Sequence, residues 1–184
     1  MEQTFTIDDI TYTPTSPNTA SAIAYNNNGS QGSITIPSSV TNNGTSLMVT
    51  SIGEAAFFQS AIIEGVVIPN SVTSIGASAF EGNFINSITL PNSLTSIGER
   101  AFFLNSITSV IIPTSITSIE ASTFGNNPSL ETVSIPNTIT TIGASAFVNN
   151  DLLEVVIPDS VETCLLYTSP SPRDATLSRM PSSA

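Results

Sequence analysis

A proline returns every 22 or 23 residues from position 69 to position 158 of this 184-residue chain, and a nearly constant phrase surrounds it. The recurring prolines are Pro69, Pro91, Pro113, Pro136 and Pro158. The phrases read VVIPNSVTSIGASAF (66–80), ITLPNSLTSIGERAF (88–102), VIIPTSITSIEASTF (110–124) and VSIPNTITTIGASAF (133–147). An earlier unit starts at Ile34 and a sixth starts at Val155. A repeat of this length is typical of a solenoid, in which each unit forms one coil.

The columns of the repeat predict local structure. Apolar residues two apart precede the proline, as at Val66 and Ile68, and this alternation is typical of a short β-strand. Proline ends the strand because it has no N–H to donate. Apolar residues three and six positions later, as at Val72 and Ile75, have Ser and Thr between them, which favours a second extended segment.

A glycine and a phenylalanine close each phrase. We expect the glycines to turn the chain with positive φ, although Glu120 stands in their column in one unit. These glycines are Gly53, Gly76, Gly98 and Gly143. We expect one helical or 3-10 turn before the phenylalanines, which would fill the core: Phe57, Phe80, Phe102, Phe124 and Phe147.

No single unit can bury its own apolar columns. Stacked at the strand spacing of about 4.8 Å, equivalent residues of successive units would form continuous ladders of Ile, Val and Phe. The predicted fold is therefore a β-dominated solenoid with a parallel sheet, short strands and a single helical or 3-10 turn per repeat.

In these residues the chain resembles the BspA-type (Treponema-type) leucine-rich repeat family, whose units read approximately L-x-x-I-x-I-P-x-x-V-x-x-I-G-x-x-A-F-x-x-C. The resemblance covers residues 32–163, as five repeats and the start of a sixth. Residues 1–31 resemble the β-rich entry segment of such arrays, in which Phe5, Ile7, Ile10 and Tyr12 would cover the first repeat. Short polar residues replace the family's cysteine, and their side chains could bond to loop backbone: Ser60, Asn83 and Asn127.

The resemblance implies a leucine-rich repeat solenoid and a function. Members of the family are secreted or surface-attached binding modules, often considered adhesive, so the expected ligand is a protein or a glycan. Two alternatives remain open, a structural spacer within a longer surface protein whose active domain is missing, and a cytoplasmic scaffold. The N-terminal MEQTFTIDDI contains no signal sequence, which fits either the scaffold or a missing start of the gene.

The charge of the chain excludes some partners. It contains no Lys, His or Trp, and 14 acidic residues against 3 Arg give a net charge of −11. Such a surface repels phosphate backbones, so nucleic-acid binding is not expected. The chain also lacks basic patches for anionic lipid, and no apolar run reaches transmembrane length, so direct membrane insertion is not expected.

The side chains that most catalysis requires are missing. Without His or Lys there is no imidazole or amine to act as a base, so we expect no catalytic residue, cofactor or metal. Asp8 and Asp9 are adjacent, and either a calcium role or a solvated turn would account for them. Glu54, Glu99 and Glu120 recur with the repeat and are interpreted as solubilising charges.

Two features are candidates for binding. The first is a pair of hydroxyl columns, which could meet a repetitive partner such as a glycan or ice, unless Thr is there only because it suits exposed strands. The columns are Thr73, Thr95, Thr117 and Thr140 beside Ser74, Ser96, Ser118 and Thr141. The second is the insertion TNNGTSLMV (41–49), whose Asn-Gly favours a hairpin that serves either as a binding loop or as part of the entry cap.

The repeat stops after Thr163. The next residues, CLLYTSPSPRD (164–174), resemble a translated transposon-type sequencing adapter, and SRMPSSA (178–184) matches the flow-cell end of the same adapter. Residues 164–184 are therefore expected to be a non-native, disordered tail, the alternative being a genuine Pro/Ser-rich tail. An array that stops here would leave an apolar strand edge open near residues 155–161, and we expect self-association through it.

Overall fold

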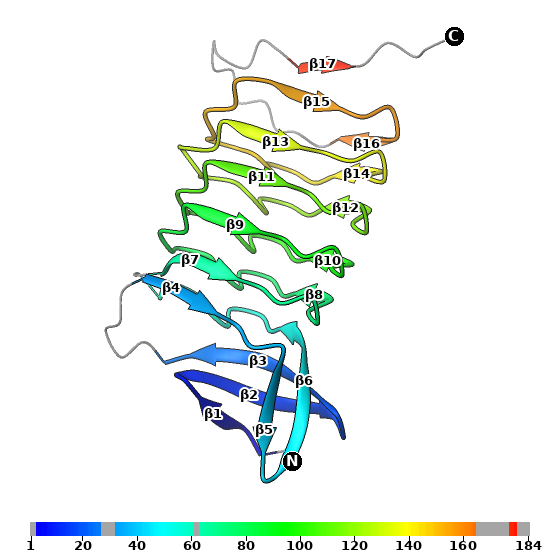
Figure 1. Cartoon of the computed structure of the whole chain (residues 1–184). Helices are drawn as coiled ribbons and strands as arrows, with labels where there is room; N and C mark the ends of the chain where they lie inside the picture. The colour runs from blue at the N-terminus through cyan, green and yellow to red at the C-terminus, as the bar shows by residue number, and fades with distance from the viewer. Residues whose placement is uncertain (1–2, 27–31, 61–62, 165–176, 180–184) are drawn as a thin grey trace.

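The computed structural model describes residues 3–26, 32–60, 63–164 and 177–179, and every regular element among them is a strand (Figure 1). Six strands belong to the N-terminal part: β1 (Phe5–Ile7), β2 (Ile10–Ser16), β3 (Thr19–Tyr25), β4 (Gly32–Thr35), β5 (Ser39–Asn42) and β6 (Thr45–Ile52). Nine follow in the coils: β7 (Ile63–Val67), β8 (Ser74–Ile75), β9 (Ser87–Thr89), β10 (Ser96–Ile97), β11 (Ser109–Ile111), β12 (Ser118–Ile119), β13 (Thr132–Ser134), β14 (Thr141–Ile142) and β15 (Val155–Ile157). The last two are β16 (Thr163–Cys164) and β17 (Leu177–Arg179).

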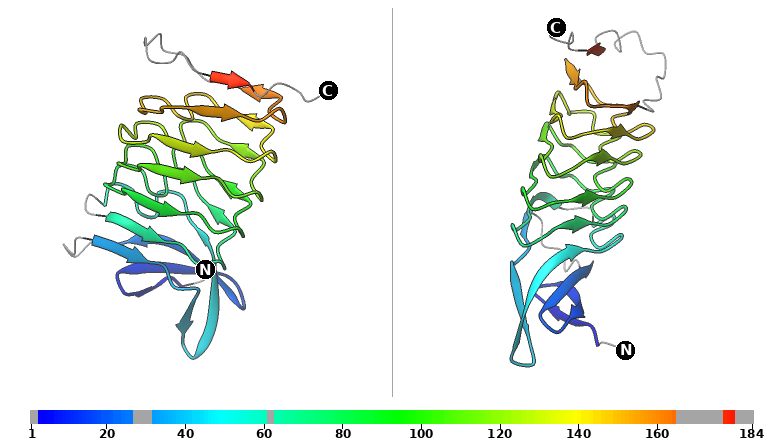
Figure 2. Two further views of the ribbon diagram at one scale, coloured as in Figure 1. Left: turned by 45° about the horizontal axis from the view of Figure 1, so that its top comes forward. Right: turned by 90° about the vertical axis from the view of Figure 1, so that its right-hand side faces the viewer.

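The coils stack into a solenoid with two columns of short strands (Figures 1 and 2). In the first column β4, β7 and β9 pair in parallel, as do β11 and β13. In the second column β6, β8 and β10 pair in parallel, as do β12, β14 and β16. The predicted parallel, β-dominated leucine-rich repeat solenoid is thereby confirmed.

The N-terminal segment covers the open end of the solenoid. Strands β1, β2 and β3 pair antiparallel, and β3 then pairs in parallel with β6 of the first coil. Ile10 and Tyr12 are buried in the common core, and Phe5 and Ile7 pack against it. These four residues therefore cover the stack, as the resemblance implies.

Two tight turns shape this N-terminal region. Asp8 and Asp9, with φ of 48° and 65°, form the two-residue turn between β1 and β2. Asn43 and Gly44, with φ of 48° and 81°, form the turn of the β5–β6 hairpin, so the insertion is the hairpin that Asn-Gly predicts. Asp8 and Asp9 thus have a structural explanation as turn residues.

The third side of each coil differs from the expected helical turn. Here the chain makes two successive i→i+3 turns, as in the bonds Ala79 N–H to Gly76 O and Glu81 N–H to Ser78 O. A helix cannot form because the residue at the centre is in the left-handed region, with φ between 52° and 57°. The five residues are Ala55, Ser78, Arg100, Ser122 and Ser145.

The expectation of positive φ at the recurring glycine column is wrong, because the left-handed residue lies two positions later. Glycine is present for a different reason, the close approach of neighbouring coils. A Cβ on Gly76 would lie 2.5 Å from the backbone nitrogen of Glu54, and one on Gly98 equally close to that of Ala77. Glu120, which stands in this column in one coil, does not have positive φ either.

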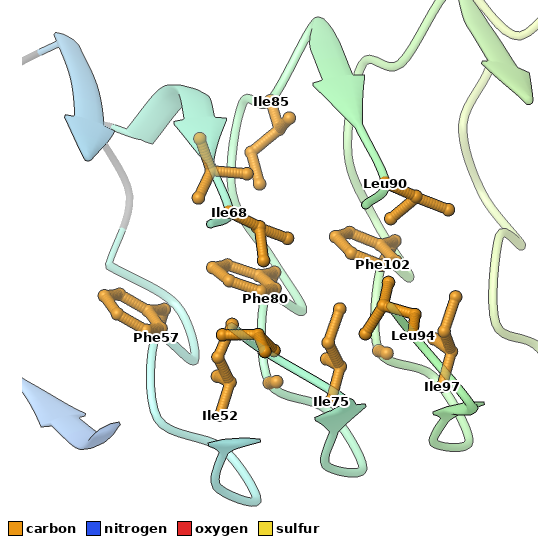
Figure 3. Close-up of a cluster of buried hydrophobic side chains, with 14 of the residues drawn as sticks. Ile52, Phe57, Ile68, Ile75, Phe80, Ile85, Leu90, Leu94, Ile97 and Phe102 are labelled. Carbon is orange, nitrogen blue, oxygen red and sulfur yellow. The ribbon is translucent and has the colours of Figure 1, made fainter. Parts of the chain in front are cut away.

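A stack of phenylalanine rings runs through the core (Figure 3). The ring centroids are separated by 4.9 Å between Phe57 and Phe80 and by 5.3 Å between Phe80 and Phe102, with nearly parallel planes. Phe124 and Phe147 continue the stack, and Tyr25 closes it at the N-terminal end. Phe57, Phe80, Phe102 and Phe124 are therefore each stacked between rings on both sides.

Buried asparagines hold the backbone beside this stack. The Asn105 side-chain NH₂ donates to the carbonyls of Phe80 and Phe102, and its Oδ1 accepts from Ile85 N–H. Asn127 repeats all three bonds, and Asn83 repeats the two donor bonds. The expected role of short polar residues in place of the family's cysteine is confirmed for these asparagines.

The last described coil is paired on both strand columns. β15 pairs in parallel with β17, and Cys164 in β16 pairs with Ile142 in β14. Cys164 and residues 177–179 thus differ from the expected disorder, because an open strand edge bonds through backbone and accepts segments without the repeat sequence. Residues 165–176 and 180–184 lie outside the described residues, and both self-association and the origin of the tail stay predictions.

The left-handed residues lead to a first test by substitution. We expect Ala55→Gly to stabilise the fold by about 1 kcal/mol, because glycine removes the steric cost of φ 52°. Ala144→Gly is the matched control one residue before the left-handed position, and it should destabilise by roughly 0.5–1 kcal/mol through added backbone freedom. Urea denaturation midpoints measure both, and a loss of stability in Ala55→Gly would contradict this account.

The asparagine ladder leads to a second test. We expect Asn105→Ala to lower the free energy of unfolding by about 2–4 kcal/mol, because it leaves the buried Ile85 N–H without an acceptor and two carbonyls with one donor fewer. Asn92→Ala, at an exposed position, should change it by less than about 0.5 kcal/mol. Equal effects in the two variants would show that the ladder contributes nothing.

Candidate binding surfaces

The predicted hydroxyl columns lie along the second strand column. The four threonines of the first hydroxyl column are exposed. In the second column, three of the four residues are half-buried: Ser74, Ser118 and Thr141. The exposed members are Thr73, Thr95, Thr117 and Thr140, together with Ser96. The structure therefore brings the predicted residues together as a regular surface, along β8, β10, β12 and β14.

Most of the threonine hydroxyls already have an acceptor. The Thr73 Oγ1 donates to Thr50 O at 3.2 Å, and the Thr95 Oγ1 donates to Thr73 O at 3.0 Å. The Thr140 Oγ1 donates in the same way to Thr117 O at 3.3 Å. Since a hydroxyl has one proton, these three groups can offer a ligand only their lone pairs. Ligand binding by the hydroxyl columns stays a prediction.

The outer face of the first strand column, which we call the strand face, carries side chains of a different kind. Its aliphatic residues point to solvent where a polar residue would be ordinary: Val67 is 55%, Ile111 74% and Leu153 69% exposed. Glu64 and Glu131 lie on the same face and are exposed. Sequence reasoning missed these positions, although Val67 and Ile111 each occupy the x of an apolar–x–apolar step, which marks an outward residue.

The strand face is hollowed around Gly65. A depression of about 270 Å³ lies over β4, β7 and β9, around Gly65. Its polar lining consists of Ser33, Glu64, Asn86, Ser87 and Thr89. Gly65 pairs with Ser33 on one side and Ser87 on the other, so the hollow lies where this column of side chains lacks one.

The third side of the coils holds the only basic residue before position 164, Arg100. Its guanidinium donates to both carboxylate oxygens of Glu81, at 3.0 and 2.6 Å, and lies 3.9 Å from the centre of the Phe103 ring. The hydrogen bond from Arg100 keeps the pKa of Glu81 below its usual value, although burial acts in the opposite direction. This cation is already paired within the protein.

Some kinds of site do not occur in the part of the chain that the structure describes. Within it, no three His, Cys, Asp or Glu side chains gather where they could hold a metal ion. The same residues include no helix long and apolar enough to cross a membrane.

Comparison with known proteins identifies the family of the repeat. The family described as the BspA type leucine-rich repeat region matches residues 50–168, with six copies of its repeat. The chain belongs to this family. A search of curated proteins finds no significant match to this chain.

Solved structures agree with the BspA-type solenoid. A leucine-rich cell surface protein from Faecalibacterium prausnitzii A2-165 is 26% identical, with a TM-score of 0.64 over 89% of this chain and 51% of its own. The pneumococcal vaccine antigen PcpA is 20% identical, with a TM-score of 0.74 over 89% of this chain and 46% of its own. The chain therefore spans about half the length of each of these proteins, and PcpA supports the fold alone.

The Arg100–Glu81 pair leads to a test by pH. Because the pKa of Glu81 is lowered from 4.5 in the folded protein, the pair stabilises the fold above about pH 4.5 and this contribution disappears as the pH falls through the lowered pKa. The advantage of the wild type over Arg100→Gln should therefore be larger at pH 7 than in acid, where only the contact of Arg100 with Phe103 remains. Denaturation midpoints from pH 7 downward measure it, with Glu99→Gln as a charge control, and a difference that does not shrink in acid would contradict it.

Proposed function

We propose that the chain is a non-enzymatic binding module, displayed on the cell surface or secreted, that docks a protein ligand on its strand face. The family supports a protein-binding repeat protein. The ligand surface, the location and the adhesion-like role are our proposal.

The observation that carries the proposal is the exposure of Val67, Ile111 and Leu153 on a face that is otherwise polar. A parallel strand needs its inward residues for the core, whereas core packing does not select the outward ones, for which β-branched residues are favoured only by strand propensity. Aliphatic side chains kept in water on such a face are typical of surfaces that another protein covers. They lie in the first, third and fifth of five successive coils, which gives the ligand an elongated contact area.

A glycan ligand at the hydroxyl columns is the second candidate. Its support is the regular spacing of Thr73, Thr95 and Thr117, each one coil from the next. Its weakness is that most of these hydroxyls donate their proton to the preceding coil. We therefore favour the strand face, which offers unused apolar area as well as polar groups.

Display outside the cell is supported by the relative from Faecalibacterium prausnitzii, which is described as a cell surface protein and is 26% identical. The spacer and scaffold alternatives predict other outcomes. A spacer would bind nothing by itself, and a scaffold would be found inside the cell. Antibody labelling of intact source cells tests the location, and labelling that requires permeabilised cells would support the scaffold.

Binding to arrays of purified extracellular proteins and glycans tests the ligand surface. We expect binding to a protein ligand, weakened about fivefold or more by Ile111→Ser, because a central aliphatic contact is lost. Thr95→Val is the matched control on the hydroxyl columns and should leave the affinity unchanged. Both positions are exposed, so both variants should fold normally.

Two results would overturn the proposal. Binding to no protein on the arrays would support the spacer instead. Loss of glycan binding in Thr95→Val, with Ile111→Ser unaffected, would assign the ligand to the hydroxyl columns.

A further inference from the structure

The hollow around Gly65 interrupts the strand face at a defined point. In the column of outward residues that runs through Ser33, Gly65 and Ser87, only the middle strand lacks a side chain. The depression therefore spans the width of about two strand spacings, close to 10 Å. Val66 and Val67 of β7 are also among the residues that line it.

Glycine is not required for folding at this position. Gly65 does not have positive φ, and a Cβ added there would lie 2.8 Å from its nearest neighbour, the Ser33 Oγ, a hydroxyl that can rotate away. This differs from Gly76, where a Cβ would meet backbone atoms. The hollow at Gly65 is thus a feature that the fold tolerates but does not need.

The chemistry of the lining suits a cation. Glu64 supplies a carboxylate, Asn86 an amide oxygen, and Ser33, Ser87 and Thr89 supply hydroxyl oxygens, all of which accept hydrogen bonds. The single basic residue before position 164 is Arg100, which is bound to Glu81 on another side of the coils. Within the described residues, Glu64 forms no ion pair.

We propose that the hollow binds a lysine or arginine side chain of a basic polypeptide ligand, with the terminal cation at Glu64 and the aliphatic stem along Val67. This assignment rests on the proposed function, since it names the chemistry of the protein that the strand face docks. The net charge of −11 attracts such a ligand from a distance. The apolar stem of lysine or arginine matches the exposed aliphatic side chain beside the carboxylate.

A neutral glycan fits the hollow less well. No aromatic ring, the usual platform for a sugar, is among the residues that line it. The carboxylate of Glu64 can accept hydrogen bonds but cannot donate any, whereas sugar hydroxyls need both.

The test uses the full chain and synthetic extended peptides that alternate lysine with valine or glutamate with valine. We expect the lysine peptide to bind and the glutamate peptide not to bind. Glu64→Gln should weaken the lysine peptide about two- to fivefold, the range of a solvent-exposed charge pair. Gly65→Thr should weaken it about tenfold or more by filling the hollow, and added salt should weaken it as well.

Matched controls remove the same groups elsewhere on the face. Glu131→Gln removes an equal charge from an exposed position three coils away, and Ser109→Thr adds a methyl group in the Gly65 column where there is no hollow to fill. Neither control should change the affinity for the lysine peptide by more than about twofold. Should Gly65→Thr fail to fold, the comparison of Glu64→Gln with Glu131→Gln decides the question.

The outcomes separate this inference from the proposed function. Equal effects of Glu64→Gln and Glu131→Gln, with Gly65→Thr harmless, would overturn the cation site, while sensitivity to Ile111→Ser would leave the strand face as the docking surface. Binding of a neutral oligosaccharide that Gly65→Thr abolishes would overturn the assigned chemistry. If no strand-face variant changes the affinity for any ligand, both the cation site and the strand face as a docking surface are overturned.

Discussion

The contact between one coil and the next is the interaction on which this structure depends. The Phe80 ring lies between Phe57 and Phe102, at centroid distances of 4.9 and 5.3 Å, so the ring of one coil is the core of its neighbours. The asparagine side chains act in the same way, since each donates to a carbonyl of the preceding coil. A coil by itself would have no interior, and the N-terminal sheet exists because the first coil also needs a neighbour.

This stacking also dictates the surface. Equivalent outward residues form straight columns because the coils superpose at strand spacing, whether or not a ligand uses them. Regularity is therefore weak evidence of function, as the threonine hydroxyls bonded to the preceding coil illustrate. Departures from regularity are more informative. On the strand face they include Gly65, which leaves a hollow, and the aliphatic side chains of Val67, Ile111 and Leu153, which are exposed to water.

Several expectations failed where backbone conformation depends on the neighbouring coil. Position 76 requires a glycine because the Glu54 backbone lies against it, and Gly76 does not have positive φ. Ser78 has positive φ although serine has no marked preference for it, and its N–H is bonded to Glu99 O of the next coil. Two successive i→i+3 turns replace the expected helical turn, again because the backbone is bonded to the neighbouring coil. Contacts between residues 21 or 22 apart determine these backbone conformations. Local sequence propensity therefore does not predict them.

The amino-acid sequence by itself determined the repeat, the inward columns of Ile, Val and Phe, the two strand segments, the hairpin at Asn43–Gly44 and the acidic surface, because these follow from periodicity, turn chemistry and composition. Only the tertiary structure decided which hydroxyls are already bonded, that Arg100 is committed to Glu81, and that Gly65 opens a hollow between Ser33 and Ser87. The reason is physical: hydrogen bonds and hollows form between coils, and their geometry is set by the separation and register of the stack.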